Sequence, residues 1–273
     1  MYYFPELKTA RFSANMQELK IKDTLKLLSI PAHNIEVLTT QFLESVLVDC
    51  PLSPKQMTIE ERNLCVCHYI SATSDDKMPD FVVGDNANLS NYLNAGKMYP
   101  YTKIQPTVIG NFNEQPLAII SISGANAEAI ERLNGEVENL NNRSHFLIAS
   151  MAAQLIFNYN ENDFANDTKI NDLLNLDDEQ LLKKVDFILN LTETEFLQVL
   201  ELFTNGTKQI YHYFNVSYAD EFYNENTGDY IPAGYIILPI NNDNEKGGGD
   251  NLVLSPARFQ DYSYFSKISR EIF

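Results

Sequence analysis

The chain has 273 residues, 44% of them hydrophobic, so it can build a substantial core, and wholesale disorder is excluded. Its net charge is −17, from 37 acidic and 20 basic residues without a basic run, which excludes nucleic acid and membrane surfaces as direct partners. Three cysteines, no secretory signal and no apolar stretch long enough to span a membrane lead us to expect a soluble protein made in a reducing compartment.

The first 72 residues predict an extended start followed by three short helices. Pro5 excludes an early helix, and "KIKDTLKLLSI" (20–30) is a short helical stretch closed by a proline. Residues 33–49 have apolar side chains at the spacing of an amphipathic helix, and Asn34 is placed to cap it.

The third helix has the clearest start in the chain. Thr58 is followed three residues later by Glu61, the pattern of a capping box, in which hydroxyl and carboxylate satisfy each other's backbone amides. We expect this helix to run to about Ala72 and to carry Cys65, Cys67 and His68. Beyond it, residues 75–101 show no regular pattern, although "DFVVGDN" is compatible with a short strand.

The middle of the chain predicts one β-hairpin and several helices. Residues 107–124 have β-branched runs on either side of "NFNEQP", which is typical of a hairpin. Helical periodicity returns in "ANAEAIERLNGEVENL", which we expect to be one helix with its acidic side chains exposed. "HFLIASMAAQLIFNY" is apolar on most sides and predicts the central buried helix. Two amphipathic helices follow, "DDEQLLKKVDFILN" and a second that begins with the box Thr192 to Glu195 and weakens at Gly206.

The character of the sequence changes after Asn215. Residues 216–240 are aromatic and contain the extended-looking "YIPAGYIILPI", and residues 241–251 form a polar, glycine-rich link. The last segment is again aromatic, which predicts an arm that either folds back on the body or binds a neighbour. Its candidate partner-binding residues are Phe259, Tyr262, Tyr264, Phe265 and Phe273.

Cys65, Cys67 and His68 raise the question of a metal or catalytic site. On a helix the two cysteines point about 200° apart, so they do not share a metal ion. Cys65 and His68 face similarly but lack a second ligand pair, because Cys50 stands alone and the remaining histidines, His33, His145 and His212, are scattered. We expect buried core residues here, and a Cys–His dyad only through distant pairing.

No other motif indicates catalysis or cofactor binding. Residues 158–168 and 241–251 are rich in Asn and Asp but do not keep the register of a calcium loop, so we expect solvated loops. "GGGDN" lacks the lysine and hydroxyl of a phosphate loop, and no serine elbow, zinc-protease motif or dinucleotide fingerprint occurs. We therefore expect no cofactor, no metal and no enzymatic activity, with scattered carboxylates or Cys67–His68 chemistry as the enzymatic alternative.

The order of short patterns in residues 4–76 resembles the baseplate hub assembly proteins of T-even-type tailed bacteriophages. The patterns are "FPELKT", then "LKIKDTLKLL", then "FLESVLVDCPLSPKQ", and last "MTIEERNLCVCHYISATSDD", which has the form (L/M)T-x-x-(D/E)-R followed by a Y-x-S end. The match covers about a quarter of the chain, and residues 216–273 have no counterpart in it. Some members of that family end with paired cysteines, which this chain lacks.

The resemblance implies a non-enzymatic virion protein of the tail baseplate, assembled in the host cytoplasm through contacts with other tail or baseplate proteins in a symmetric oligomer. A transient tail-assembly chaperone, absent from the mature particle, is the alternative. We expect a mainly α fold with a small β element (α+β). Its parts are a helical N-terminal unit (1–100), a hairpin and helical body (101–215) and an extended C-terminal arm (216–273).

Overall fold

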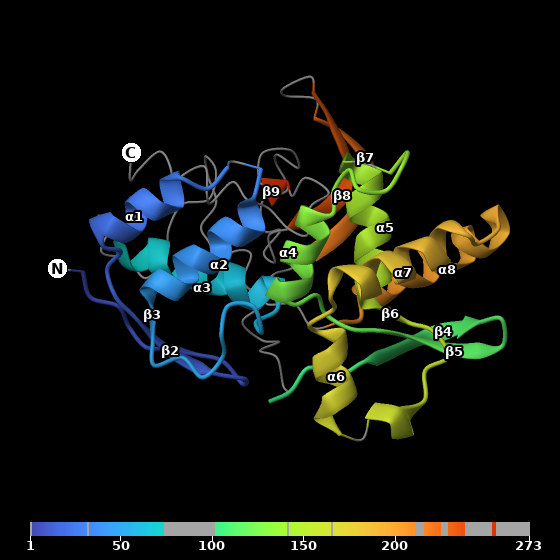
Figure 1. The fold of residues 1–273 in the computed structure, drawn as a ribbon, viewed down its shortest axis with the longest axis horizontal. Helices are drawn as coiled ribbons and strands as arrows, with labels where there is room; N and C mark the ends of the chain where they lie inside the picture. Colours follow the sequence, from blue (N-terminus) through green and yellow to red (C-terminus); the bar gives the residue numbers. More distant parts are fainter. Residues whose placement is uncertain are drawn as a thin grey trace, which may run out of the picture.

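The structure is a computed structural model that describes residues 2–31, 33–73, 102–140, 142–164 and 166–210, together with the backbone of three later strands. It is mainly helical with small antiparallel sheets, which confirms the predicted fold class (Figure 1). The helices are α1 (Ile21–Leu28), α2 (Ile35–Val46), α3 (Ile59–Thr73), α4 (Gly124–Arg132), α5 (Asn142–Gln154), α6 (Asp167–Leu173), α7 (Asp178–Leu189) and α8 (Glu193–Thr207).

In the described part of the chain, three antiparallel sheets accompany the helices. Their strand orders are β1-β2-β3, β4-β5-β6 and β7-β8-β9. The strands are β1 (Leu7–Lys8), β2 (Ser13–Met16), β3 (Leu47–Val48), β4 (Thr107–Phe112), β5 (Gln115–Ile119), β6 (Leu155–Ile156), β7 (Val216–Asn224), β8 (Asp229–Ile237) and β9 (Val253–Leu254). The extended N-terminal segment and the three helices that follow it are thus as predicted.

The predicted hairpin is β4 and β5. Phe112 pairs with Gln115, so only Asn113 and Glu114 form the turn, and both have positive φ (49° and 64°). A two-residue turn of this kind twists in the same sense as the strands that it joins. One face of the hairpin packs against α8, where Gly110 and Gly206 let the strand and the helix approach closely.

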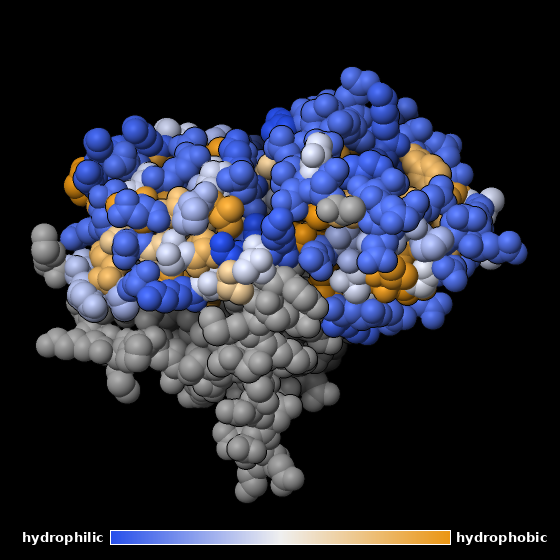
Figure 2. All heavy atoms as spheres, turned by 90° about the horizontal axis from the view of Figure 1, so that it is seen from below, coloured by the Kyte–Doolittle hydropathy of each residue, from blue (hydrophilic) through white to orange (hydrophobic). Residues whose placement is uncertain are grey.

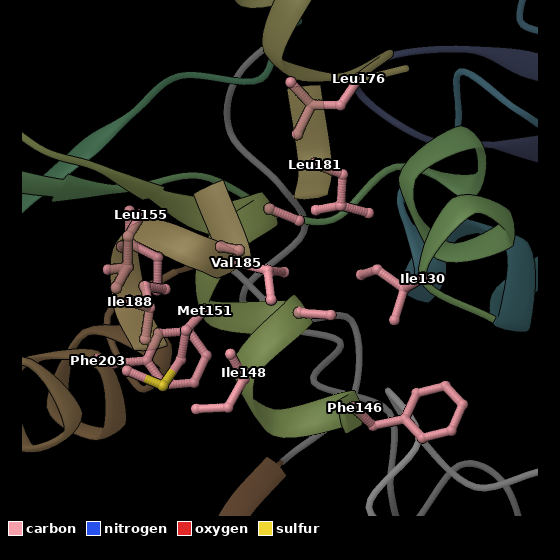
Figure 3. Close-up of a cluster of buried hydrophobic side chains, with 14 of the residues drawn as sticks. Ile130, Phe146, Ile148, Met151, Leu155, Leu176, Leu181, Val185, Ile188 and Phe203 are labelled. Atoms are coloured by element: carbon pink, nitrogen blue, oxygen red, sulfur yellow. The ribbon is translucent and has the colours of Figure 1, made fainter. Parts of the chain in front are cut away.

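The described residues form two large apolar cores and a third, small cluster around Ile104, Ile120 and Ile170. The N-terminal core lies between β2, α2 and α3; its members include Phe12, Met16, Phe42, Leu43, Met57, Cys65, Cys67 and Tyr69. The body core surrounds α5, as predicted from the apolar character of that segment, although its last residues form β6. Figure 3 shows Ile148 and Met151 of α5 among residues from the neighbouring helices: Ile130 from α4, Leu181, Val185 and Ile188 from α7, and Phe203 from α8.

One predicted helix is shorter than expected. Residues 125–140 were predicted as a single helix, but α4 ends at Arg132 and the chain then turns at Asn134 and Gly135. An Asn-Gly dipeptide is a typical turn signal, and here it overrides the helical spacing of the later apolar residues. The expected exposure of the acidic side chains holds for Glu136 and Glu138 but was wrong for Glu128 and Glu131, which are buried.

The predicted loops have mixed outcomes. Residues 158–168 are largely exposed as expected, but they include a short 3₁₀ helix at Glu161–Phe164 and the start of α6. The possible strand "DFVVGDN" and the link at 241–251 lie outside the described residues. The segment predicted as extended after residue 229 is strand β8, which pairs with β7 on one side and with β9 on the other.

Candidate functional site

The sequence-predicted anchors Phe259, Tyr262, Tyr264, Phe265 and Phe273 lie outside the described residues. Their role in partner binding therefore stays a prediction. The described part of the C-terminal region is the backbone of β7, β8 and β9, in which Val253 pairs with Ile237 and Leu254 with Ile236. The chain that leads to the aromatic segment thus starts from the edge of this sheet.

Cys65 and Cys67 are core residues, as predicted. Both side chains are fully buried in the N-terminal core, and neither cysteine forms a disulfide. Burial, reinforced by the neighbouring Cys50 and Glu61, raises the pKa of the Cys65 thiol far above its usual value. Because the thiolate is the reactive and metal-binding form, a thiol held protonated is a poor nucleophile and a poor ligand.

His68 connects helix α3 to the extended N-terminus. Its Nε2 lies 2.8 Å from the carbonyl oxygen of Pro5, which accepts the hydrogen bond. Within residues 2–31, 33–73, 102–140, 142–164 and 166–210, no group of three or more His, Cys, Asp or Glu side chains is arranged to hold a metal ion. Among the described helices, none is long and apolar enough to cross a membrane.

The most organised set of polar side chains lies where the two cores meet. Figure 1 shows α4 beside α2 and α3, at the junction of the N-terminal elements and the body. Buried polar and charged residues from these three helices gather there. We call this set the junction cluster: Glu36 and Thr40 of α2, Glu61 and Arg62 of α3, and Glu128 and Glu131 of α4.

Arg62 is the centre of the junction cluster. Only 1% of its side chain is exposed, and its Nη1 lies 3.0 Å from Oε2 of Glu36. Its Nη2 donates to the backbone carbonyl of Glu36 (2.6 Å) and to Oγ1 of Thr40 (3.1 Å). A buried guanidinium is stable only when its charge is paired and hydrogen-bonded, and α2 supplies both here.

Glu128 extends the cluster from α2 to α4. Its Oε1 accepts a short hydrogen bond from the hydroxyl of Thr40, and its Oε2 lies 3.0 Å from Nζ of Lys55. Thr40 therefore accepts from Arg62 and donates to Glu128, so one hydroxyl connects all three helices.

Glu131 caps a helix that is distant in sequence. The backbone N–H groups of Ile35 and Glu36 donate to its two carboxylate oxygens, at 2.7 and 2.9 Å. Asn34 occupies the predicted cap position of α2, but its side chain makes no capping hydrogen bond. The partial positive charge at the start of α2 is thus neutralised by a carboxylate from α4.

The predicted capping box of α3 is present and is tied to the N-terminus. The Thr58 N–H donates to Oε2 of Glu61 (2.8 Å), and the Glu61 N–H donates to Oγ1 of Thr58 (3.2 Å). Arg11 Nη1 reaches the same Oε2 at 2.6 Å. Burial raises the pKa of the Glu61 carboxyl, although Arg11 and the Thr58 hydrogen bonds oppose this.

The backbone also joins the two parts at this place. The N–H of Gly124 donates to the Met57 carbonyl (2.8 Å), and the N–H of Ala125 donates to that of Lys55 (2.9 Å). A Cβ atom at Gly124 would lie 2.4 Å from the Pro54 carbonyl oxygen and 2.7 Å from Nη1 of Arg62. Only glycine fits between these atoms.

The junction cluster holds α2, α3 and α4 together inside the molecule and presents no reactive group to solvent. Its carboxylates are already used as ion-pair partners or helix caps, and its charges are shielded by three helices. Sequence reasoning missed Glu128 and Glu131 because they were assigned to a solvated face. The available signal was the run "GANAEA", since small residues on several faces let neighbouring helices come close.

Comparison with known proteins gives no match: no family model, no curated protein and no solved structure is similar to this chain.

Proposed function

We propose that this chain is a structural or assembly protein of a bacteriophage tail baseplate, made in the host cytoplasm, that acts through contacts with other tail proteins and is not an enzyme. The observation that carries the proposal is the resemblance of residues 4–76 to baseplate hub assembly proteins. The structure supports it in that residues of these patterns pack against one another in one unit.

The first and last patterns meet in the N-terminal core. Phe4 of "FPELKT" stacks on Tyr69 of the Y-x-S end, with ring centroids 5.3 Å apart. Tyr69 also meets the edge of Phe42 (5.1 Å) and accepts a hydrogen bond from the N–H of Leu19 (3.0 Å). Spacing between these patterns is therefore constrained by packing.

Each specified position of the pattern (L/M)T-x-x-(D/E)-R contributes to packing, helix capping or ion pairing. Met57 is fully buried, Thr58 and Glu61 cap α3, and Arg62 makes the buried ion pair with Glu36. A substitution at any of these positions would disturb the fold rather than an exposed site. Such a unit suits a protein that works through its outer surfaces.

The test is the presence of the chain in particles. Mass spectrometry of purified, DNA-filled virions should detect it as a baseplate component. Absence from virions that nevertheless need the gene to form tails would favour the chaperone alternative. A gene that is dispensable for tail assembly, with its product absent from virions, would contradict both.

The proposed role of the C-terminal arm needs its own variants. A chain ending at Ser255 keeps β9, whereas a chain ending at Asn251 would remove a strand that pairs with β8. We expect the Ser255 truncation, and the full-length F259A/Y262A/Y264A/F265A variant, to fold normally but to be lost from particles. Incorporation at the wild-type level would refute the anchoring role while leaving the baseplate assignment open to the virion test.

A further inference from the structure

Lys184 is a lysine whose side chain is withdrawn from the surface. On the visible face in Figure 2 most of the described residues are hydrophilic, as expected for a chain with many exposed charges. Lys184 of α7 is instead partly buried, and its Nζ donates a hydrogen bond to the carbonyl oxygen of Leu155 (3.1 Å). Figure 1 shows α7 beside α5 and β6, so this hydrogen bond joins the helix to the strand that follows α5.

No carboxylate accompanies this amine within the described part of the chain. Lys184 makes no ion pair there, and its hydrogen-bond partner is a backbone carbonyl. The strands β6 and β5, which pair with each other, contain no charged residue, and neither do residues 151–154 at the end of α5. The positions three and four residues away on α7 are also uncharged: Gln180, Leu181, Phe187 and Ile188.

The neighbouring Lys183 differs from Lys184 in both counter-charge and contact with water. Its Nζ lies 2.6 Å from Oε1 of Glu179, one turn earlier, and the two side chains are 72% and 78% exposed. Lys183 and Asp186 lie about 100° and 200° around the helix from Lys184, so they project to other sides of α7. Two consecutive lysines therefore stand in different environments.

This environment makes the Lys184 amine a nucleophile near neutral pH. Burial lowers its pKa to about 8, because the ammonium form loses hydration without gaining a carboxylate partner. At pH 8 about half of this amine is neutral, whereas a lysine with the reference pKa of about 10.4 is only about 0.4% neutral. Lower basicity and partial burial offset part of the gain, but the neutral amine is the form that attacks an electrophile.

We propose that Lys184 is a site of acylation, at which the amine takes an acyl group from an activated donor, a thioester or an acyl phosphate. The neutral Nζ attacks the carbonyl carbon of the donor and forms an N–C bond, while the C–S or C–O bond of the donor breaks. The thiol or phosphate leaves, and the proton lost by the nitrogen goes to the leaving group or to solvent. The step therefore balances without any further reactant.

The product fits the place that Lys184 occupies. An amide is neutral, so the unpaired charge between α7 and β6 disappears. Its nitrogen keeps one N–H, which can still donate to the carbonyl oxygen of Leu155. A Schiff base formed with an aldehyde would have no N–H at this nitrogen and would leave that carbonyl without its donor. The geometry thus favours acyl donors over aldehydes.

Competitive acetylation of the folded wild-type chain tests the proposal, with Lys183 as the internal reference. The chain is incubated at pH 8 with acetyl-coenzyme A in one arm and with acetyl phosphate in the other, and mass spectrometry quantifies each modified lysine. We expect acetylation of Lys184 to be at least about threefold faster than that of Lys183 in at least one arm, which identifies the donor class. In urea the preference should vanish, because it depends on the fold.

The pH profile distinguishes Lys184 from a lysine that is merely accessible. Between pH 8 and pH 9.5 its acetylation rate should rise by no more than about twofold, whereas the rate of a lysine with the reference pKa rises nearly thirtyfold. The proposal is overturned if the rate at Lys184 follows the steeper profile. It is equally overturned if acetylation follows exposure and favours Lys183 with both donors.

The acylated product is tested in a chain with Lys184→Nε-acetyllysine. At pH 7 it should unfold at the same temperature as the wild type or at a higher one, because a buried charge is gone. The pKa of Lys184 is about 8 in the folded chain and about 10.5 in the unfolded one, so the wild type should gain stability relative to this variant as the pH rises through that window.

Lys183→Nε-acetyllysine is the matched control. It modifies an exposed ion pair and should leave the unfolding temperature close to that of the wild type. A lower unfolding temperature at pH 7 for the chain acetylated at Lys184, with the control unchanged, would show that the acyl group does not fit and would overturn the proposal. This inference concerns the purified chain alone and does not rest on the baseplate assignment.

Discussion

Arg62 carries a full charge where solvent does not reach, and α2 supplies its partners. Replacing it with methionine keeps most of the side-chain volume but removes the positive charge that pairs with the buried carboxylate of Glu36. Breaking a buried ion pair from one side costs about 3–5 kcal/mol. We expect R62M to lose about that much free energy of unfolding, measured by urea denaturation followed by circular dichroism.

The double variant E36Q/R62M is the matched control. It removes both charges, so no uncompensated ion remains, and it should recover part of the stability lost in R62M. If the double variant is less stable than R62M, the pair contributes more than charge compensation, and the interpretation of the junction as a neutralised joint is wrong.

The burial of His145 leads us to expect that the free energy of unfolding depends on pH. It is buried in the body core region, its Nε2 donates to the Ile130 carbonyl (2.7 Å), and burial lowers its pKa below the usual value. In the window below about pH 6.5 the unfolded chain therefore binds more protons at this site than the folded chain. The contribution to stability is complete above that pH and is lost as the pH falls.

The H145Q variant isolates this contribution, because glutamine keeps an N–H donor and does not titrate. We expect the free energy of unfolding of the wild type to fall relative to H145Q between pH 7.5 and pH 5.5. Chemical denaturation at several pH values measures the difference. A difference that stays constant over this range would show that burial does not depress the pKa of His145.

At the scale of elements, local signals predicted helix starts better than helix ends or distant partners. The boxes at Thr58–Glu61 and Thr192–Glu195 are present because all their atoms come from one turn. The cap of α2 was not predictable in this way, since its carboxylate comes from Glu131, 96 residues after Ile35. Burial of Glu128 and Glu131 likewise follows from packing between helices, which periodicity in one segment does not show.

The contact between α8 and β4 gives a prediction at this scale. Glycine inside a helix costs about 1 kcal/mol relative to alanine, so G206A would stabilise an isolated helix. In the folded chain, however, the new Cβ would lie 2.6 Å from Cγ2 of Ile109. We expect the overpacking to dominate, with a net loss of about 1–3 kcal/mol in thermal or chemical unfolding.

Two further variants test the cause of that loss. N205A, at the neighbouring exposed position of α8, should be neutral or slightly stabilising because alanine has the higher helix propensity. The combination of I109A with G206A should cost less than the sum of the single changes, since the colliding methyl group is gone. Additive losses would mean that Gly206 is needed for a reason other than the approach of Ile109.

At the scale of the whole molecule, the two cores are coupled through the junction cluster. The fold class and most helices of residues 20–73 were predictable because their signals are local. The coupling was not, because it depends on long-range contacts between Arg62, Glu36 and the residues of α4. The N-terminal unit therefore has its own apolar core, but polar groups of its helix α2 form hydrogen bonds with side chains of the body.

A fragment of residues 1–73 tests this dependence. It keeps the N-terminal core and the Arg62–Glu36 pair, but it loses Glu128 and the Glu131 cap. We expect the amides of Ile35 and Glu36 to exchange with solvent much faster in the fragment than in the full chain, as measured by hydrogen-exchange NMR. E131Q in the full chain should show the same local loosening and cost about 0.5–2 kcal/mol. Unchanged protection in both would contradict the role of Glu131.

Because Glu131 caps α2 from 96 residues later in the chain, α2 is synthesised well before its cap. A ribosome that adds about 5–20 residues per second needs about 5–20 s to extend the nascent chain by the 96 residues from Ile35 to Glu131. Until then the first turn of α2 lacks its carboxylate cap. Arg62 is synthesised before α4, so it is present before that cap can form. The N-terminal unit therefore matures only after Glu131 has been synthesised.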